Sequence, residues 1–410
     1  MNILVFNPGS ATLKFGLYHL PALSKAPSTP DSATMVANGS IEPVGGPQSE
    51  LKMFVAKQQP VIEPIEATTL AQLVKQIIRH LLAYAGQNNQ APLTIDAIGC
   101  RVVHGGTIYV EPTRVTSSVL DGLRALVDLA PLHNLEDVAV LEELRRSLPD
   151  TPLVAVFDTA FHQTLPPVAY NYALPVGLSA RYKLRRYGFH GISHAYVSEQ
   201  LIKHLGRGAQ DTRVITCHLE NGASVCAVRG GQSIDTSMGL TPVEGLVMGT
   251  RSGDVDPGLV LYLIRTAGMT ASEVDSLLNH QSGLRGLSGL SADVRDLEQA
   301  EREGDESAEL ALEVFAYRAR KYIGAFAAAL EGLDGVAFTG GIGEHSASMR
   351  SRICQGLGFL GLRLDDELNG AANGRVAMRI SEDSGSVQIW VIPTDEERQI
   401  AWSTYEQLRN

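Results

Sequence analysis

At 410 residues the chain is too long for one ordinary hydrophobic core, so two domains of roughly 150 to 200 residues are expected. Its formal net charge of −11, from 34 basic and 45 acidic residues, argues against nucleic acid or an anionic membrane as a partner. Hydrophobic residues make up 44% of the sequence, which is enough to fill substantial cores. An anionic substrate would therefore have to be held by local positive groups.

The N-terminal stretch and the cysteines indicate the compartment. MNILVFNPGS has neither the basic region nor the cleavage site of a signal peptide, and the apolar runs fall far short of the roughly 18 residues that a spanning helix needs. These features predict a cytosolic protein. Because the cysteines have no C-x-x-C spacing, we interpret them as small apolar residues and not as zinc ligands or a disulfide framework. They are Cys100, Cys217, Cys226 and Cys354.

The start of the chain predicts short strands joined by turns, and then a helix. Residues 3–6 form an apolar strand, residues 7–12 a turn, and residues 15–20 a second strand. The segment 21–64 is rich in Pro, Ser and Gly without sustained periodicity, which predicts irregular strands and loops or a surface insertion. In residues 68–85 the apolar positions fall on one helical face, which predicts a helix.

Polar residues stand where two further predicted strands end. The strand at 97–103 carries Arg101 near its end and is followed by His104, and the apolar strand at 153–157 runs into Asp158. Open α/β sheets place their ligands at the carboxyl ends of strands. Arg101 and Asp158 are therefore candidate site residues, although each alone could equally be a structural ion-pair partner or a turn residue.

The segment 214–258 is the most informative stretch of the sequence. A strand at 214–217 leads to the turn at Asn221 and Gly222, and a strand at 224–229 leaves it, which predicts a hairpin with a glycine-rich tip. Glycine lets backbone N–H groups face an anion without a Cβ in the way. The guanidinium of Arg251, further along, is a planar cation that suits a phosphoryl group. The segment favours phosphate chemistry, although Arg251 alone could be an ion-pair partner.

The strand, turn and strand near the N-terminus repeat the layout of this hairpin roughly 200 residues later, which suggests a duplicated fold with one phosphate loop from each half. Chance similarity is the alternative. The remaining sequence predicts a helix from residue 191 to about 205, mostly helical stretches at 257–278 and 298–330, strands at 336–338 and 387–392, and a terminal helix at 397–408. The outline is that of two α/β domains.

Several simple motif interpretations are weak. The sequence contains no G-x-x-x-x-G-K-[ST], so a P-loop is excluded. Residues 356–361 match G-x-G-x-x-G but follow an apparent helix and not a strand. His190 and His194 are spaced like zinc ligands but lack the Glu and third ligand of a zinc hydrolase. Lys14 could be a solvated strand residue, and Glu396 a helix-start carboxylate.

Longer blocks of sequence resemble the acetate kinase family. They lie in order, nearly from end to end: residues 7–15 (NPGSATLKF), 101–106 (RVVHGG), 131–134 (PLHN), 157–162 (FDTAFH), 187–191 (YGFHG), 235–239 (DTSMG), 249–254 (GTRSGD) and 341–344 (GIGE). Several blocks exceed five consecutive residues. The match is therefore far more specific than any single motif.

The resemblance implies a fold and a reaction. Acetate kinases belong to the sugar kinase/actin (ribonuclease H-like) superfamily, so the expected fold class is α/β, with two duplicated α/β domains and an interdomain cleft. The expected bounds are 1–158 plus 396–410 for the N-terminal domain, to which the terminal helix returns, and 159–395 for the nucleotide-binding domain. The family, usually homodimeric, transfers the ATP γ-phosphoryl group reversibly to acetate with Mg²⁺ or Mn²⁺, giving acetyl phosphate and ADP.

The resemblance also implies roles for individual residues. The catalytic residues would be Asp158, Arg101, Arg251, His190 and His133. Contacts to ATP or ADP would come from two phosphate loops and an adenosine side: Asn7, Ser10, Thr12, Lys14, His218, Asn221, Gly222, Asp293, Arg295, Gly341 and Gly343. The small carboxylate substrate would lie against Arg101 in an apolar pocket of Val103, Leu132, Phe189 and Pro242. The metal, which keeps several waters, would be positioned by Asn7, Glu396 and Asp158 directly or through water.

Three positions depart from the family pattern. Glu220 stands where the family usually has Gly in a His-Leu-Gly-Asn-Gly loop, so a carboxylate would either weaken nucleotide binding or point away from the phosphates. Thr12 replaces the commoner Ser and keeps its hydroxyl. His345 replaces the usual Asn after Gly-Ile-Gly-Glu, which bears on nucleotide preference.

The main hypothesis is an acetate kinase with direct in-line transfer. Propionate should be a slower substrate, because one methylene in an apolar pocket discriminates by only about 1 to 3 kcal/mol. The nearest rival is a propionate or butyrate kinase of the same family. From other classes, the rivals are a non-catalytic ATP-binding protein on the same fold and a zinc hydrolase that uses His190 and His194.

Overall fold

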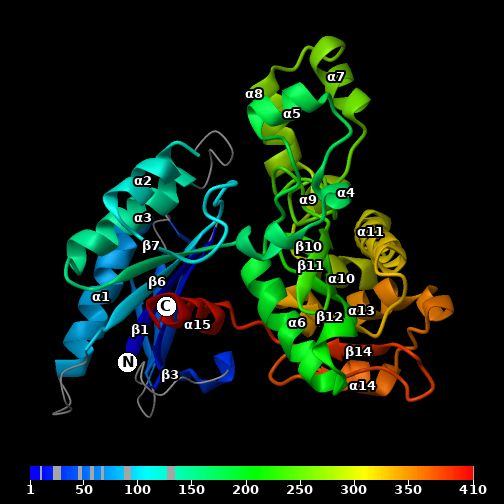
Figure 1. Ribbon diagram of the computed structural model, residues 1–410. Coiled ribbons are helices and arrows are strands. Elements are labelled where there is room, and N and C mark those ends of the chain that lie inside the picture. The colour runs from blue at the N-terminus through cyan, green and yellow to red at the C-terminus, as the bar shows by residue number, and fades with distance from the viewer. Residues whose placement is uncertain are drawn as a thin grey trace. The chain divides into compact units, whose positions relative to one another are not determined.

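The computed structural model describes residues 1–9, 12–21, 29–44, 49–55, 60–65, 69–86, 94–126 and 134–409. The chain divides into two compact units, Met1–Ala160 with Asp395–Asn410, and Phe161–Thr394 (Figure 1). Each unit is built on one mixed sheet with helices packed against it. None of the described helices is long and apolar enough to cross a membrane.

The first unit contains an eight-stranded sheet in the order β5-β4-β3-β2-β1-β6-β8-β7. Its strands are β1 (Asn2–Pro8), β2 (Leu13–His19), β3 (Thr34–Glu42), β4 (Glu50–Val55), β5 (Val61–Pro64), β6 (Ala97–Val102), β7 (Thr113–Arg114) and β8 (Leu153–Phe157). From β5 to β1 the pairing is antiparallel, whereas β1, β6 and β8 run parallel. The residues at the carboxyl ends of these three parallel strands therefore meet at one edge of the sheet.

Helices cover both faces of this sheet. One core joins α1 (Leu70–Gly86), α2 (Ser117–Arg124) and α3 (Asn134–Ser147) to alternate strand residues such as Ile98 and Cys100. Gly99, between them, faces the opposite side, where the terminal helix α15 (Glu396–Arg409) packs against β1, β6 and β8. A Cβ at Gly99 would come within 2.3 Å of Oγ1 of Thr404. The glycine lets α15 lie directly on β6.

The second unit contains a six-stranded sheet in the order β11-β10-β9-β12-β14-β13. The strands are β9 (Arg213–Leu219), β10 (Ala223–Arg229), β11 (Gln232–Thr236), β12 (Gly335–Thr339), β13 (Met378–Arg379) and β14 (Gln388–Val391). β9 and β10 form an antiparallel hairpin, and β9, β12 and β14 run parallel. This confirms the hairpin that the sequence predicts around Asn221 and Gly222.

Two long helices pack on the second sheet: α6 (Gly191–Leu205) contacts β9 and β12, and α11 (Glu306–Ala329) contacts β9 and β10. The other helices are α4 (Pro167–Tyr170), α5 (Val176–Tyr182), α7 (Pro257–Arg265), α8 (Ala271–Ser276), α9 (Gly283–Ser288), α10 (Val294–Arg302), α12 (Gly340–His345), α13 (Ala347–Cys354) and α14 (Asp366–Ala371). Figure 1 draws α5, α7 and α8 at the same end of this unit.

The two sheets repeat the same strand pattern. In the first, β3-β2-β1-β6-β8 joins an antiparallel meander to parallel strands, and in the second, β11-β10-β9-β12-β14 does the same in the same order of pairing. A helix also lies on the central pair of each sheet: α15, which follows the strands of its unit, on β1 and β6, and α6, which precedes the strands of its unit, on β9 and β12. The duplicated α/β fold predicted from the two hairpins is therefore confirmed.

The prediction of irregular strands and loops or a surface insertion for residues 21–64 was correct only in that strands are present. Most of its described part forms β3, β4 and β5, which extend the sheet in register beyond β2. Inward positions such as Ala37, Ile41, Leu51 and Met53 are buried, but much of the opposite face is exposed or half-buried. Since only one face is buried, the apolar residues never form a sustained run, and the Pro and Gly residues dominate the local signal.

The mostly helical stretches at 257–278 and 298–330 contain breaks. The second becomes α10 and α11 because Gly304 has a positive φ of 92° and the side chain of Asp305 caps α11 by accepting hydrogen bonds from Ser307 and Ala308. The first becomes α7 and α8, and Thr270 and Glu273 form a capping box at the start of α8.

All four cysteines are buried and unbridged, as expected for small apolar residues.

Candidate active site

In the first unit, an arginine and an aspartate meet at the carboxyl ends of two adjacent parallel strands. β6 carries Arg101, and Asp158 directly follows β8, its parallel neighbour. Arg101 donates from Nη2 to Oδ2 of Asp158 at 2.8 Å and from Nη1 to the carbonyl oxygen of Pro8 at 2.5 Å. The two side chains are 15% and 1% exposed. The structure thus brings these two candidate residues into direct contact.

The charges around Arg101 keep it protonated. Burial alone would lower the pKa of the guanidinium, but the negative charges of Asp158 and Glu396 raise it by more, so its pKa lies above the ordinary value. The Nε–H group of Arg101 is buried and has no hydrogen-bond partner among the described residues. A ligand oxygen could accept from this donor.

An acidic group lies at the end of β1. Asn7 donates from Nδ2 to Oε2 of Glu396 at 2.8 Å and to Oε1 of Glu397 at 2.7 Å, both in the first turn of α15. Burial raises the pKa of Glu397, and the charge of neighbouring Glu396 adds to the rise, whereas Lys14 and Asn7 oppose it. Lys14 is the register partner of Asn7 across the β1–β2 hairpin. Asn7, Lys14 and Glu396, all predicted site residues, thus belong to one cluster.

Asp137 in α3 supports the chain beside Arg101, and sequence reasoning missed it. Its Oδ2 accepts a hydrogen bond from the backbone N–H of Val103 at 2.7 Å, and the residue is 3% exposed. Burial raises the pKa of this carboxyl to about 7, although the Val103 N–H and Arg101 oppose the shift. Its only sequence signal is an acidic residue in the first turn of a predicted helix, which usually indicates helix capping.

The remaining predicted residues of the first unit are less informative. Thr12 accepts a hydrogen bond through its backbone carbonyl from the N–H of Gly9 at 2.8 Å, which closes the described part of the β1–β2 turn. Val103 is buried just beyond β6. Ser10, Leu132 and His133 lie outside the described residues, so their assignments stay predictions.

In the second unit, His190 precedes α6 in a conformation that is uncommon for histidine. Its φ is 56°, in the left-handed region, where a residue with a Cβ is strained. The ring is held by Ser224 of β10, whose Oγ lies 2.8 Å from Nδ1. Such strain clusters at functional sites, where the surrounding structure fixes an unfavourable backbone for the sake of side-chain direction.

His190 and Arg251 converge on Gly222 at the tip of the β9–β10 hairpin. A Cβ built on Gly222 would lie 3.3 Å from Nε2 of His190 and 3.3 Å from Nη1 of Arg251. The backbone N–H of Gly249, two residues before Arg251, donates to the carbonyl oxygen of Asn221 at 3.0 Å. The hairpin tip, the arginine loop and the start of α6 therefore form one group, which we call the Gly222 cradle (His190, Asn221, Gly222 and Arg251).

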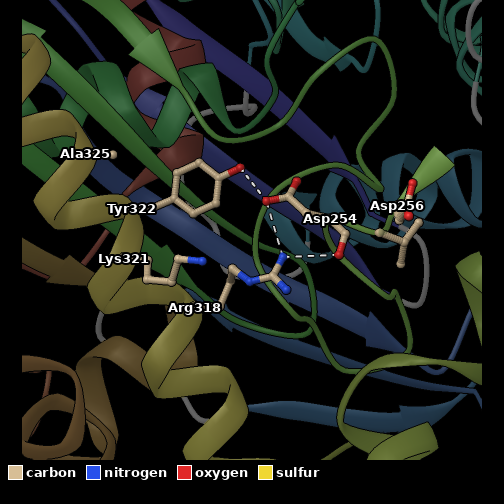
Figure 2. Close-up of a pocket in the computed structure, with 7 residues that line it drawn as sticks. Asp254, Asp256, Arg318, Lys321, Tyr322 and Ala325 are labelled. Atoms are coloured by element: carbon tan, nitrogen blue, oxygen red, sulfur yellow. Dashed lines mark hydrogen bonds and ion pairs between the residues drawn. The ribbon is translucent and has the colours of Figure 1, made fainter. Parts of the chain in front are cut away.

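Asp254 anchors the loop that carries Arg251. It accepts hydrogen bonds from the N–H of Gly245 and from the hydroxyl of Tyr322, each at 2.8 Å, and pairs with Arg318 at 3.2 Å. Figure 2 shows Tyr322 and Arg318 of α11 directed at Asp254, at the edge of a pocket of about 390 Å³ that Asp256 and Lys321 also line. These contacts fix the loop to the longest helix of the unit.

His218 and Glu220 lie on the same hairpin. Nδ1 of His218 is 2.8 Å from Oγ of Ser193, and Nε2 is 3.7 Å from the carboxylate of Glu220. The Glu220 side chain is half exposed, and it lines a pocket of about 570 Å³. The unusual glutamate therefore borders this pocket and is not turned away into the protein.

That pocket brings together several residues predicted to contact the adenosine side. Its lining includes Asn221, Asp293, Arg295, Gly341 and His345. Arg295 forms a two-point hydrogen bond with Asp293, at 3.0 Å from Nε to Oδ1 and 2.5 Å from Nη2 to Oδ2. Gly343 is different: it is buried, and a Cβ there would lie 3.3 Å from the backbone of Phe338, so its glycine is explained by packing.

Phe189 and Pro242, predicted for the substrate pocket, also belong to the second unit. Phe189 is 2% exposed, and its carbonyl oxygen lies 3.0 Å from Nε2 of His162. Pro242 is half-buried in the long loop before α7.

The zinc-hydrolase alternative finds no support in the geometry. Nδ1 of His194 lies 2.7 Å from Oγ1 of Thr216, and Nε2 lies 2.8 Å from Oγ of Ser224, so both ring nitrogens are engaged by hydroxyls. Across the part of the chain that the structure describes, no group of three or more His, Cys, Asp or Glu side chains is arranged to hold a metal ion.

Comparison with known proteins decides the family. The model of the acetokinase family matches residues 2–402. The chain belongs to the acetokinase family. The acetate kinase of Heliobacterium modesticaldum is 44% identical over 416 residues, which cover 100% of both chains. Two similar solved structures each have a TM-score of 0.87 over 99% of both chains: the acetate kinase of Porphyromonas gingivalis at 38% identity and a propionate kinase from Francisella tularensis at 36%.

The acetokinase match confirms the resemblance stated from the sequence, and the structure confirms the expected α/β fold class with two sheets. Sequence reasoning missed Ser224, Thr216 and Ser193, which contact the predicted histidines. A single Ser or Thr inside an apolar strand gives no functional signal by itself. The spacing of two residues between Thr216 and His218 was the available signal, since such residues share one face of a strand.

Proposed function

We propose that the protein is an acetate kinase: it transfers the γ-phosphoryl group of ATP to acetate, reversibly, giving acetyl phosphate and ADP. The Gly222 cradle carries the proposal, because an arginine and a histidine converge there on the tip of a glycine-containing hairpin in a chain of the acetokinase family. Guanidinium and imidazole N–H groups are strong donors to phosphoryl oxygens. The pocket of about 570 Å³ beside Asn221 and Gly341 would take the nucleoside.

We assign the acetate carboxylate to Arg101. Its Nε–H is buried without a partner among the described residues, and leaving such a donor unsatisfied costs about 1–3 kcal/mol, which a ligand oxygen would offset. Asp158 holds the guanidinium in place from the other side. Val103, two residues after Arg101, is buried and apolar, and we propose it for the pocket that holds the acetate methyl group. Leu132, Phe189 and Pro242 stay proposed members of the same pocket.

The chemistry requires alignment more than proton transfer. An acetate oxygen attacks the γ-phosphorus, the bond from that phosphorus to the bridging β–γ oxygen breaks, and ADP leaves with the electron pair. Acetate is already ionised at neutral pH, so no strong base is needed. The barrier is the approach of two anions, which Arg101 and Arg251 would lower. Arginines that neutralise a transferring phosphoryl group contribute about 10³ to 10⁵ in rate in other enzymes. His190, and by resemblance His133, would donate to its equatorial oxygens.

The donor set at the end of β1 fits a small hard cation. Asn7 and Glu396 provide amide and carboxylate oxygens, and Asp158 lies near the same strand ends, although it is paired with Arg101. Mg²⁺ binds through few carboxylates, several waters and substrate phosphates, and Mn²⁺ accepts the same ligands. When bound, the ion would neutralise charge on the ATP phosphates.

The test is acyl phosphate formation from ATP with acetate, propionate and butyrate, trapped as the hydroxamate and compared by kcat/KM. The expected result is the largest kcat/KM for acetate and a decrease with chain length, with acetate and propionate separated by about 1–3 kcal/mol. A larger value for propionate would identify a propionate kinase, a name that one of the similar structures carries. Tight ATP binding without product from any acid would favour a non-catalytic nucleotide-binding protein.

We also propose that the protein works as a homodimer in the cytoplasm. The helix α7 reads PGLVLYLIR, and none of its residues is buried. Leu259, Leu261 and Tyr262 on α7 are 45%, 47% and 59% exposed, and α5 at the same end likewise has no buried residue. Gathered exposed apolar side chains of this kind indicate a protein interface. The unbridged cysteines agree with a reducing compartment.

A further inference from the structure

A chain of hydrogen bonds leads away from the Gly222 cradle into the core of the second unit. From His190, Nδ1 lies 2.8 Å from Oγ of Ser224, which lies 2.8 Å from Nε2 of His194. Nδ1 of His194 lies 2.7 Å from Oγ1 of Thr216. We call these four residues (His190, Ser224, His194 and Thr216) the hydroxyl–imidazole chain. Ser224, His194 and Thr216 have no exposed surface.

The local fold explains why the four groups meet. Thr216 lies on β9 opposite Cys226 of β10, and Ser224 precedes that residue by two, so both hydroxyls point to the face on which α6 packs. His190 and His194 stand one helical turn apart at the start of α6, and the N–H of His194 donates to the carbonyl of His190 at 2.9 Å. The sheet therefore provides the hydroxyls and the helix provides the rings.

We infer that Ser224, His194 and Thr216 are positioning residues that hold His190 with its proton on Nε2, directed at the transferring phosphoryl group. This inference rests on the function proposed above. A neutral imidazole has one donor and one acceptor nitrogen, and a hydroxyl has one proton to donate. Each ring and each hydroxyl has a single proton to donate, so when Ser224 donates its proton within the chain, the direction of one hydrogen bond fixes the direction of the others.

Two directions are possible along such a chain. In one, Thr216 donates to His194, His194 donates from Nε2 to Ser224, and Ser224 donates to Nδ1 of His190, which leaves the proton of His190 on Nε2. In the other, every donor and acceptor is reversed, and Nε2 of His190 carries a lone pair. A phosphoryl oxygen attracts an N–H group and repels a lone pair, so an anion in the Gly222 cradle selects the first direction.

The chemistry of the hydroxyl–imidazole chain also favours His190 as a neutral hydrogen-bond donor over His190 as an acid that transfers a proton. The partner at Nδ1 is a hydroxyl, which is uncharged, whereas a carboxylate at that place would stabilise an imidazolium. In the proposed reaction the acetate oxygen carries no proton to be removed, so the histidine has only to donate a hydrogen bond. No bond to hydrogen is broken in this role.

The first test removes one hydroxyl that lies three hydrogen bonds from the His190 ring. Thr216→Val keeps the side-chain shape but cannot donate to His194, so both directions of the chain become accessible to His190. We expect kcat to fall by about 10- to 100-fold, the range found when groups that orient catalytic ligands are removed, with the KM for ATP and acetate changing by about two-fold or less. The matched control is Thr236→Val, because Thr236 is equally buried in the same sheet but bonds to a backbone carbonyl.

A double-mutant cycle separates this inference from the proposed function. Ser224→Ala should lower kcat in the wild-type background and have no further effect in a His190→Ala background, because Ser224 acts through His190. An equal loss in both backgrounds would overturn the inference and leave the role of His190 intact. If His190→Ala itself turns over normally, the role of His190 in the proposed function is wrong, and the chain has nothing to position.

The tautomer can be observed directly in protein labelled with ¹⁵N at histidine. With ADP bound, the His190 resonances, assigned by their loss in His190→Ala, should show a protonated Nε2 and an unprotonated Nδ1. In Thr216→Val the two His190 nitrogens should report a mixture of the Nε2–H and Nδ1–H tautomers. In Thr236→Val they should show the wild-type pattern. The same pure Nε2–H form in Thr216→Val, or an Nδ1–H form in the wild type, would contradict the inference.

Discussion

Arg101 donates from Nη2 to Oδ2 of Asp158 at 2.8 Å, at the ends of two parallel strands, and both groups are largely withdrawn from solvent. The pair leaves the Nε–H of Arg101 as a buried donor without a partner among the described residues. Because the paired guanidinium still has an unused buried donor, we assign it to a ligand.

Replacing Arg101 by lysine should keep the positive charge but remove the planar guanidinium with its several N–H donors. Lysine is a compact ammonium that cannot donate to Asp158, Pro8 and a ligand in the same geometry. We expect kcat/KM for acetate to fall by about 100-fold, while the KM for ATP changes much less. The control is Arg207→Lys, because Arg207 is an exposed side chain that pairs with Asp334 in the second unit. An unchanged kcat/KM for acetate in Arg101→Lys would remove Arg101 from the substrate site.

Gly222→Ala tests the cradle itself. The added Cβ would lie at 3.3 Å from both Arg251 and His190, so at least one of the two side chains must move. Small misplacements of catalytic groups cost up to about 100-fold in rate, and we expect kcat to fall by about 10-fold or more with little change in thermal stability. Gly208→Ala is the control, because a Cβ at Gly208 meets nothing within 4 Å. Normal turnover in Gly222→Ala would contradict the assignment.

Glu220→Gly should strengthen nucleotide binding. The carboxylate lines the same pocket as Asn221, where its charge opposes that of the ATP phosphates. Removing it should lower the KM for ATP by about 2- to 10-fold, and the difference should shrink as salt is raised, because the group is half exposed and screened. A KM that rises in the variant would instead mean that Glu220 contributes a hydrogen bond to the nucleoside.

Asp137 predicts a pH dependence of stability. Burial raises the pKa of its carboxyl to about 7, above the ordinary value of 3.8, so the folded protein binds this proton more tightly than the unfolded chain does. The contribution of this group to stability is therefore complete below about pH 4 and is lost as pH rises toward 7. Asp137→Asn keeps an oxygen for the Val103 N–H without the charge. Its unfolding free energy relative to wild type should increase from pH 5 to pH 8; a constant difference would contradict the shifted pKa.

Leu261→Asp tests the proposed homodimer. A charge in the middle of the exposed apolar face of α7 would be desolvated in any interface there, so light scattering coupled to size exclusion should report a monomer. Phe359→Asp is the control, since Phe359 is 80% exposed in another part of the unit. If wild-type protein is itself monomeric at micromolar concentration, the dimer proposal is wrong.

Much of the fold could be predicted from sequence because the signals were local. The strand at 153–157 and the turn at Asn221 and Gly222 were found from apolar runs and glycine placement. The regular pairing of the three strands between residues 34 and 64 was missed because each strand is buried through contacts with a neighbouring strand elsewhere in the sequence. Propensity cannot represent such pairing.

The site residues likewise divide into those with a local sequence signal and those whose role depends on distant contacts. Arg101 and Asp158 could be linked in advance, because parallel strand ends meet at one edge. The sequence offers His194 only as a possible zinc ligand, and it gives Ser224 and Thr216 no functional signal. Their importance comes from three hydrogen-bond distances between a helix and two strands, which no spacing in the sequence encodes. Buried hydroxyls become informative once their partners are known.

The terminal helix α15 belongs to the first unit, although the whole second unit separates it from the rest of that unit in the sequence. A ribosome therefore makes the β1–β6–β8 face more than two hundred residues before it makes the helix that covers it. Until residues 396–409 are made, that apolar face has no α15 to cover it. A chain cut short before residue 396 would therefore lose both the cover of its first sheet and the Glu396 side chain at once.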